Sequence, residues 1–197
     1  MPRTIEENNK LKEERINKIL KSSLKLFVIH GFDSVSMDQI CNDVGCSHGL
    51  IYHYFTNKLE ILEALKKQSQ IVFNKEFLKI NKENNGLLTN FKKTHSLFIK
   101  SLKESEDKRY YLFLFLTIAQ SKLLNEDLKK YINQKFKYLV NVFREIAKNN
   151  PELSNINPKE AAFSYYNYLV GTLYITIKNP DYIKFISEDF ILDIIKV

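Results

Sequence analysis

The chain has 197 residues, of which 44% are hydrophobic and 13% aromatic, and it contains no Trp. This composition indicates one or two packed domains and excludes a disordered chain. Two Cys exclude a disulfide framework, the polar N-terminal stretch lacks a signal-peptide pattern, and the longest apolar run is too short to cross a bilayer. We therefore expect a cytoplasmic protein without a membrane partner.

The net charge of +7 is not concentrated near the N-terminus. Residues 1–60 hold eight Lys or Arg and eight Asp or Glu, so their charges cancel and the excess lies downstream. Net charge by itself therefore does not locate a nucleic-acid surface.

The first part of the chain has the periodicity of short helices joined by tight turns. Apolar residues recur every three or four positions from about residue 9, which predicts a long first helix. Ser36 and Gln39 have the spacing of a capping box and predict a short second helix that ends at Gly45. Ser47 is the expected N-cap of a short third helix.

Six longer helices are predicted after the first three. Their expected ranges are 58–80, 87–103, 107–122, 126–148, 158–178 and from Pro180 to near the C-terminus. Pro158 stands at the first helical position after Asn157, which is a strong helix start. No strand alternation of useful length is present. The predicted fold class is therefore all-α, with three helices over residues 9–56, six over 57–197 and nine in total.

The segment between the second and third helices, Val44-Gly45-Cys46-Ser47, is a helix-turn-helix candidate. In this motif the second helix enters the major groove of DNA. Gly49 would let the start of that helix approach DNA closely, and the backbone N–H groups of its first turn suit a phosphate. Ile51 and Phe55 are expected to point inward. The expected DNA-binding residues are Ser36, Ser47, His48, Gly49, Tyr52, His53 and Lys58.

The stretch GFDSVSMDQICNDVGCSHGLIYHYFTNKLEIL resembles the N-terminal domain of the TetR family of bacterial transcriptional regulators. The residues that fit the family pattern are Gly31, Ser36, Ile40, Val44, Gly45, Ser47, Gly49, Tyr52, Tyr54, Phe55, Lys58 and Leu62. His48 and Leu59 depart from it, because a basic and an acidic residue are common at these positions. The resemblance covers residue 9 to about residue 63. It implies a homodimeric repressor that binds a palindromic DNA operator through a helix-turn-helix domain (9–56) and a small ligand through a ligand-binding and dimerisation domain (57–197).

Cys41, Cys46, His48 and His53 also have the ligand types of a zinc site. Cys41, however, falls on the core-facing side of its helix, and the two His diverge by about 140° around a helix. A free Cys commonly behaves as a small hydrophobe. We therefore expect no metal and no cofactor, and the lack of a catalytic motif favours a protein that is not an enzyme.

Two stretches of the C-terminal part, residues 110–120 and 163–177, are apolar on nearly every side. Such helices are buried within a subunit and against a partner. Together with the family resemblance, this predicts a four-helix dimer interface formed by the last two helices of each subunit. The residues expected there are Ala161, Tyr168, Gly171, Ile175, Ile186 and Phe190. An ordinary core is the alternative interpretation.

A pocket for a small hydrophobic or aromatic effector is expected among the fifth to eighth predicted helices. Its candidate lining residues are His95, Phe98, Tyr111, Tyr138, Tyr165 and Tyr166. Core packing is the alternative for each of them. The rival function from another class is a helical carrier of hydrophobic ligands without DNA binding, which would not need the polar residues around the third helix.

Overall fold

The computed structural model describes residues 4–82, 86–117 and 126–187, and every regular element within these ranges is helical. The α-helices are α1 (Ile5–His30), α2 (Met37–Val44), α3 (His48–Tyr54), α4 (Lys58–Lys82), α5 (Leu87–Glu104), α6 (Glu106–Thr117), α7 (Glu126–Asn149) and α8 (Pro158–Lys178). Two 3₁₀ helices, η2 (Pro151–Leu153) and η3 (Pro180–Phe185), precede and follow α8. The predicted all-α fold class is confirmed.

The first helix begins earlier than its apolar periodicity predicts. The backbone N–H of Thr4 donates to Oε2 of Glu7 (2.8 Å), and the N–H of Glu7 donates to Oγ1 of Thr4 (3.2 Å). This capping box adds an exposed, charged first part to α1. At the other end, the ninth predicted helix begins at Pro180 as the 3₁₀ helix η3. Its predicted continuation over 188–197, like the predicted end of the sixth helix at residue 122, lies outside the described residues.

Contacts divide the chain into two compact units, residues 1–70 and 71–197, and α4 contributes to both. The domain boundary predicted from the sequence, between residues 56 and 57, falls just before α4 and stays a prediction. No described helix combines the length and the hydropathy that crossing a lipid bilayer demands.

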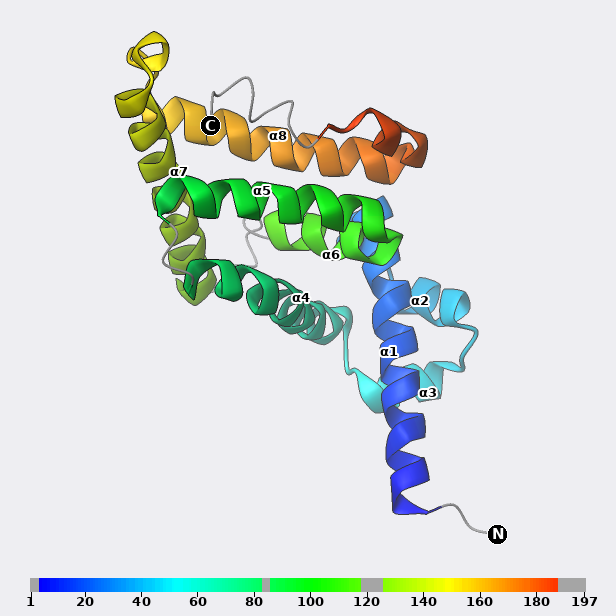
Figure 1. Ribbon diagram of the computed structural model, residues 1–197. Helices are drawn as coiled ribbons and strands as arrows, with labels where there is room; N and C mark the ends of the chain where they lie inside the picture. Colours follow the sequence, from blue (N-terminus) through cyan, green and yellow to red (C-terminus); the bar gives the residue numbers. More distant parts are fainter. Residues whose placement is uncertain (1–3, 83–85, 118–125, 188–197) are drawn as a thin grey trace. The chain divides into compact units, whose positions relative to one another are not determined.

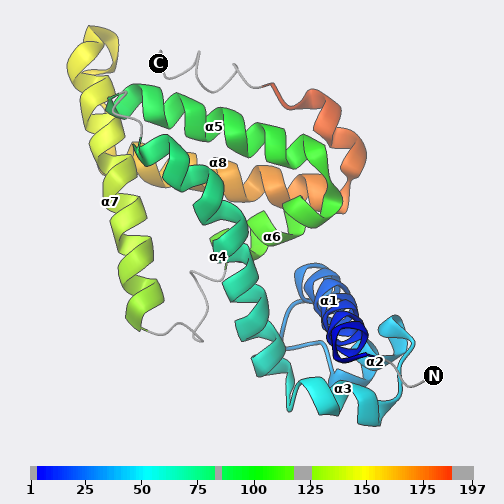
Figure 2. The ribbon, with the colours of Figure 1, turned by 60° about the horizontal axis from the view of Figure 1, so that its bottom comes forward.

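In the N-terminal unit, α1 contacts α2 and α2 contacts α3 (Figure 2). The side chains that fill its core are at most 6% exposed: Ile19, Leu20, Leu24, Phe27, Val35, Ile40, Cys41, Ile51, Phe55, Ile61, Leu62 and Leu65. Burying an aliphatic side chain of this size stabilises a fold by about 2 kcal/mol. Ile51 and Phe55, four residues apart, face this core as predicted, and they anchor the short helix α3.

In the C-terminal unit, α5 and α8 run side by side, and two hydrophobic clusters fill the space between helices (Figure 1). The first cluster joins α5, α7 and α8 around Phe91, Phe143 and Tyr165. The second joins α5, α6 and α8 around Phe98 and Leu173. Two separate clusters of aromatic and aliphatic side chains thus hold α8 in place.

Candidate nucleic-acid interface

The turn after α2 is closed by two backbone hydrogen bonds. The N–H of Gly45 donates to the carbonyl of Asn42 (3.2 Å), and the N–H of Cys46 donates to the carbonyl of Cys41 (3.1 Å). These two bonds form a Schellman motif. Gly45 has a φ of 69° and a ψ of 44°, the left-handed conformation that a side chain makes costly. The glycine predicted for the turn is therefore required by the backbone.

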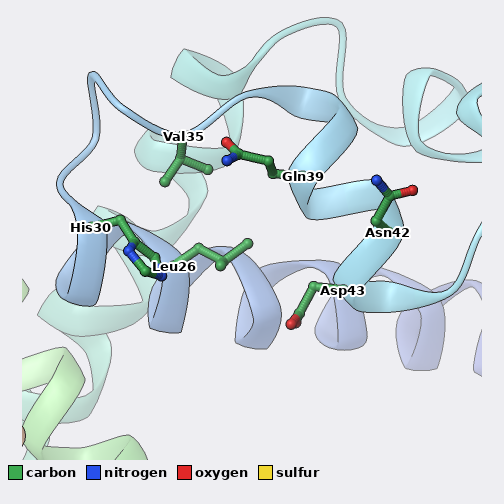
Figure 3. Close-up of a pocket in the computed structure, with 6 residues that line it drawn as sticks. All are labelled: Leu26, His30, Val35, Gln39, Asn42 and Asp43. Atoms are coloured by element: carbon green, nitrogen blue, oxygen red, sulfur yellow. The ribbon is translucent and has the colours of Figure 1, made fainter.

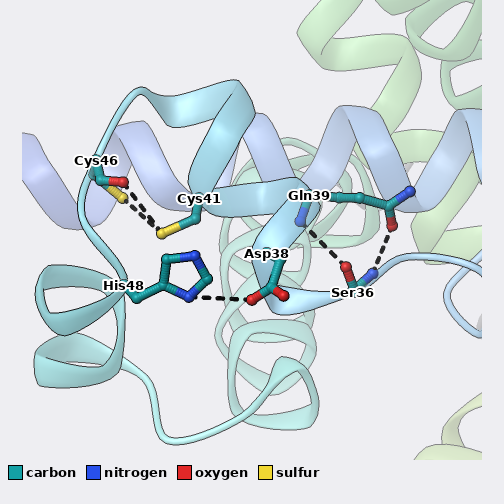
Figure 4. Close-up of polar contacts among 6 residues, drawn as sticks. All are labelled: Ser36, Asp38, Gln39, Cys41, Cys46 and His48. Carbon is teal, nitrogen blue, oxygen red and sulfur yellow. Dashed lines mark hydrogen bonds and ion pairs between the residues drawn. The ribbon is translucent and has the colours of Figure 1, made fainter.

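The helices on both sides of this turn begin at the predicted caps. Ser36 and Gln39 form a capping box, in which the N–H of Ser36 donates to Oε1 of Gln39 and the N–H of Gln39 donates to Oγ of Ser36 (Figure 4). Oγ of Ser47 accepts from the N–H of Leu50 at 3.3 Å. Each hydroxyl serves as an acceptor in its cap and retains its own O–H donor. Both caps are exposed.

The outer surface of α3 is polar, and its inner surface is apolar. The predicted DNA-binding residues at its start and along it are all exposed: Ser47, His48, Gly49, Tyr52 and His53. Tyr52, the aromatic residue among them with a hydroxyl group, is 48% exposed. Ile51, between these residues, is fully buried. The α3 helix therefore presents one continuous face of hydrogen-bonding groups to a partner.

Nothing in the fold of the chain itself requires a glycine at position 49. It lies inside α3, and a Cβ atom built on it would meet no other atom of the chain within 4 Å. Alanine would favour the helix over glycine. The position therefore has open space on the exposed face of α3, where a missing side chain shortens the approach of any partner.

His48 contacts Asp38 across the turn, with 3.1 Å between Nδ1 and Oδ1 (Figure 4). The contact joins the first residue of α3 to the first turn of α2, and both side chains remain mostly exposed. It fixes the direction of the imidazole ring, while Nε2 is not part of the contact. Asp38 was not among the predicted site residues, because ten positions separate the pair and no short motif signals it.

Lys58 binds the connection between α1 and α2. Its Nζ donates to the backbone carbonyls of Phe32 (2.9 Å), Asp33 (3.1 Å) and Val35 (3.0 Å). It also lies 4.6 Å from the centre of the Phe32 ring, a cation–π contact. An ammonium group has three N–H donors, so these carbonyls use all of them. The phosphate contact predicted for this side chain stays untested, but the structure assigns its donors to the chain itself.

The start of α4 is capped by side chains on both sides of Lys58. Oδ1 of Asn57 accepts from the N–H of Glu60 at 3.0 Å, as expected of an N-cap residue. The carboxylate of Glu60 reaches to the residue before this N-cap and accepts from the N–H and the hydroxyl of Thr56. These two hydrogen bonds lower the pKa of Glu60. The cap holds the chain between α3 and α4 in a defined path.

Cys41 and Cys46 have their thiols in contact at the same turn, with 3.4 Å between the two Sγ atoms (Figure 4). Sγ of Cys41 also donates to the carbonyl of Cys46 at 3.3 Å. Cys41 is fully buried and Cys46 is half-buried. Burial, together with the hydrogen bond between the thiols, raises the pKa of Cys41 to about 11. Among the described residues, no group of three or more His, Cys, Asp or Glu side chains is placed to hold a metal ion.

A concavity of the N-terminal unit, with a volume of about 390 Å³, lies between α1 and α2 (Figure 3). It is lined by Leu26, His30, Val35, Gln39, Asn42 and Asp43. The carboxylate of Asp43 accepts from the hydroxyl of Ser22 at 2.6 Å. This hydrogen bond ties α2 to α1 and keeps the helix-turn-helix attached to the first helix.

Three of the predicted effector-binding residues come together in the C-terminal unit. His95 is fully buried on α5, and its Nδ1 is 2.8 Å from the hydroxyl of Tyr165 on α8. Tyr138 of α7 packs against the same cluster, and its buried hydroxyl has no hydrogen-bond partner among the described residues. Burial raises the pKa of both tyrosines. A buried polar group of this kind is costly unless something satisfies it.

The other three predicted effector residues lie elsewhere in that unit. Phe98 and Tyr111 belong to the second cluster, where Phe98 is buried and Tyr111 is partly buried. The hydroxyl of Tyr166 donates to the carbonyl of Leu116 on α6. The six residues therefore divide into separate groups instead of lining one surface.

One face of α8 is exposed and largely apolar. Phe163 is 58%, Tyr174 52% and Ile175 49% exposed. A Cβ built on Gly171 would meet nothing within 4 Å, so this predicted interface residue opens onto the same face. The exposed Phe163 and Tyr174 were not among the predicted interface residues. A hydrophobic stripe in the sequence does not reveal which of its members face outward.

The remaining predicted interface residues are placed differently. Ala161 and Tyr168 pack against the first cluster of their own subunit, and the ring of Tyr168 stacks near Tyr165 and His95. Ile186 packs against the second cluster. Phe190 lies outside the described residues.

Comparisons with known proteins agree with this architecture. Residues 19–65 match the family model described as "Bacterial regulatory proteins, tetR family". The HTH-type transcriptional regulator SrpR of Pseudomonas putida is 19% identical over 170 residues, which cover 86% of this chain and 78% of SrpR. The HTH-type transcriptional regulator UidR of Escherichia coli is 36% identical over 53 residues, 27% of each chain. The structure of AibR in complex with isovaleryl coenzyme A and operator DNA has a TM-score of 0.62 at 17% identity, covering 83% of this chain and 86% of AibR.

An all-helical chain with two short helices joined by a tight glycine turn, the second exposing a polar face, belongs to the helix-turn-helix transcription regulators. Within that class, residues 19–65 match the model of the TetR family, so the N-terminal part of the chain is a helix-turn-helix region of the TetR type. The resemblance inferred from the sequence is thereby confirmed.

Proposed function

We propose that this TetR-type regulator is a cytoplasmic repressor that binds a palindromic operator as a homodimer and changes its DNA affinity when a hydrophobic effector binds. The observation that supports DNA binding most strongly is the exposed face of α3 with Gly49 at its start. This glycine serves neither the backbone nor the packing of the chain. A helical carrier of hydrophobic ligands would not need such a face.

The residues on this face divide into two proposed roles. The hydroxyl groups of Tyr52, Ser36 and Ser47 are proposed to donate to DNA phosphates, which position a protein without reading sequence. His48 and His53 are proposed to reach base edges, and the contact of His48 with Asp38 holds its ring in one direction. Within a dimer, two α3 helices roughly 34–36 Å apart would read successive turns of the major groove.

Lys58 is proposed to act on DNA binding indirectly. Because its three N–H donors bind the carbonyls of Phe32, Asp33 and Val35, it holds the connection that leads into α2. The cap of α2 at Ser36 begins immediately after this connection. Lys58 thus holds Ser36 in place without itself contacting a phosphate.

The exposed apolar face of α8 supports the homodimer. Phe163, Gly171 and Tyr174 fall on one side of the helix. In the isolated chain, Phe163 and Tyr174 are each more than half exposed to solvent. Large exposed apolar surfaces of soluble proteins mark interaction sites. A second copy of the chain is the proposed partner, since symmetric dimers are the commonest assemblies.

The effector is proposed to be largely apolar with one polar group. The cluster of His95, Tyr138 and Tyr165 is walled by aromatic side chains and contains the unsatisfied hydroxyl of Tyr138. An apolar molecule with one hydrogen-bonding group would suit this region. AibR, which has a similar fold, has a crystal structure in complex with isovaleryl coenzyme A and operator DNA. A ligand that binds only the folded state stabilises it by about 2.7 kcal/mol at a hundredfold excess over Kd, so a thermal-shift screen of apolar and charged compounds tests this class.

DNA binding is tested by fluorescence anisotropy with the DNA that flanks the protein's own gene. Tyr52→Phe removes one hydroxyl from α3 and is expected to weaken binding about tenfold. Tyr182→Phe is the matched control, because Tyr182 is 49% exposed against 48% for Tyr52 and lies on η3. Equal affinities for the two variants would refute the phosphate role of Tyr52. A wild-type protein that binds no fragment of that DNA would refute operator binding next to its own gene.

A further inference from the structure

We propose that Cys41 and Cys46 are a reversible oxidation site, at which a hydroperoxide converts the two thiols into a disulfide and thereby weakens operator binding. The chemistry rests on the geometry of the turn alone. The consequence for DNA rests on the proposed function, and the measurements below separate the two.

The backbone of the turn holds the two thiols together. Cys41 and Cys46 are the two ends of the Schellman motif, whose outer hydrogen bond joins the N–H of Cys46 to the carbonyl of Cys41. Side chains at these two positions commonly make an apolar contact. Here that contact is made by two Sγ atoms 3.4 Å apart. A disulfide needs about 2.05 Å, so closing it takes a movement of roughly 1.3 Å.

The two thiols differ in solvent exposure, and this difference determines which of them reacts first with the peroxide. Cys46 is half-buried on the turn and is reachable from solvent, whereas Cys41 is fully buried in α2. The thiolate of Cys46 attacks the peroxide oxygen, giving the sulfenic acid, while the alkoxide that leaves takes up the thiol proton and departs as an alcohol. Sγ of Cys41 then attacks the sulfenic sulfur, the S–O bond breaks, and hydroxide leaves with the proton of Cys41 as water. Two thiols and one hydroperoxide thus give one disulfide, one alcohol and one water.

Oxidation moves the start of α3. Cys41 sits in a helix held by the fully buried Ile40, so Cys46 is the residue that moves. Ser47, the N-cap of α3, is the next residue, and His48 follows it. Disulfide formation also removes the hydrogen bond from Sγ of Cys41 to the carbonyl of Cys46. Hydrogen bonds to DNA tolerate only a few tenths of an ångström, so a shift near 1 Å breaks contacts.

The disulfide would be easily reduced. It closes a loop of only a few residues and therefore stabilises the chain little, and a strained and partly exposed disulfide is labile. Intracellular disulfides of this kind are usually transient or redox-sensing. The position next to the recognition helix makes the thiol pair a sensor of peroxides, additional to the proposed effector region.

The chemistry is tested on the full chain by mass spectrometry after treatment with cumene hydroperoxide. The chain has only two Cys, and both fall in the tryptic peptide of residues 26–58. We expect this peptide to lose two hydrogens and to regain them with dithiothreitol. Cys46→Ser and Cys41→Ala each retain one thiol and both Met, so neither should lose two hydrogens. A wild-type peptide that keeps two thiols, or only gains oxygen, overturns the proposal.

The consequence is tested on the same samples by hydrogen exchange and by operator affinity. Oxidation should increase exchange at the N–H of Leu50, which is bonded to Ser47, and should weaken binding to the flanking DNA about tenfold or more. Neither Cys variant should respond to the peroxide. A disulfide that leaves both the exchange of α3 and the DNA affinity unchanged overturns the regulatory part. Reduced protein that binds no DNA would count against the proposed function, while the exchange of α3 would still decide whether the disulfide moves it.

Discussion

The two units of this protein build their candidate sites in different ways. In the N-terminal unit the site is made by backbone caps and one turn, where Ser36, Gly45 and Ser47 lie within twelve positions of one another. In the C-terminal unit, the candidate effector region is made by side chains from separate helices, as in the hydrogen bond between His95 and Tyr165, which are 70 positions apart. The candidate DNA-reading surface therefore leaves short sequence signals, and the candidate effector region does not.

The largest expected effect concerns the exposed face of α8. Gly171→Glu should leave the single chain folded, because the new side chain has open space in it. In a dimer that buries this face, an unpaired charge from each subunit should cost about 3 kcal/mol or more, which weakens dimerisation at least about a hundredfold. Analytical ultracentrifugation measures the change, and circular dichroism checks the fold.

Asn141→Glu is the matched control for this variant. It introduces the same charge at an exposed position of α7, where the amide of Asn141 already accepts from Arg144. The control should dimerise like the wild type. A Gly171→Glu protein that dimerises as tightly as the control, or a wild type that is monomeric, would contradict the proposed interface.

A second expected effect distinguishes a stabilising role of Lys58 within the chain from a contact of Lys58 with a DNA phosphate. Lys58→Met removes three hydrogen bonds and a cation–π contact, and should destabilise the N-terminal unit by about 2 kcal/mol. Lys25→Met, at an exposed position of α1, should change stability little. Urea titration measures both variants.

The salt dependence of DNA binding distinguishes the two interpretations of Lys58. If the N–H donors of Lys58 remain bound to the carbonyls between α1 and α2, Lys58 makes no phosphate contact. The slope of log affinity against log salt should then be the same for Lys58→Met and the wild type. A slope flatter by about 0.9 would show a phosphate contact of the kind predicted from the sequence.

A third expected effect belongs to the C-terminal unit and depends on pH. Burial, with smaller contributions from Tyr168 and Tyr138, raises the pKa of Tyr165 above its ordinary value of 10.0. Above pH 10.0 the unfolded chain loses a proton that the folded chain keeps, so this tyrosine's contribution to stability is intact below that pH and declines as pH rises. The decline is about 1.4 kcal/mol per pH unit for each such tyrosine.

Tyr165→Phe should therefore make stability less sensitive to alkaline pH, although it loses the hydrogen bond to His95 and about 1 kcal/mol at neutral pH. Urea titrations on both sides of pH 10.0 measure the slope. Tyr52→Phe, in the exposed face of α3, is the control and should leave the slope as it is in the wild type. A slope that Tyr165→Phe does not change would contradict the burial of this hydroxyl in the folded state.

Much of the fold could be predicted because its signals are local. The caps at Ser36, Ser47 and Asn157 and the turn at Gly45 follow from hydrogen bonds between residues a few positions apart. The inward direction of Ile51 follows from helical spacing in the same way. Sequence periodicity missed the early start of α1 after Thr4, because this stretch is charged and its apolar residue Ile5 is exposed instead of packed in a core.

Contacts between distant positions could not be predicted. The carbonyl partners of Lys58 are 23 to 26 positions away, and its spacing from them carries no pattern. The same holds for the aromatic residues of the C-terminal unit, where Tyr165 and Tyr166 are neighbours in sequence but point to different helices. Sequence identified these residues as a class, and only the packing of α8 assigns each to its surroundings.

The role of Gly49 distinguishes a DNA-reading surface from an ordinary exposed helix. Gly49→Ala should leave the free energy of unfolding unchanged or raise it by up to about 1 kcal/mol, since the added methyl group favours the helix and meets nothing in the chain. Gly45→Ala, the control, should lower it by about 1 kcal/mol because of its left-handed backbone. We predict that Gly49→Ala, as stable as the wild type, binds the operator at least about tenfold more weakly, because its methyl group occupies space that DNA needs. A stable Gly49→Ala protein with wild-type operator affinity would contradict the assignment of α3 as the DNA-reading helix.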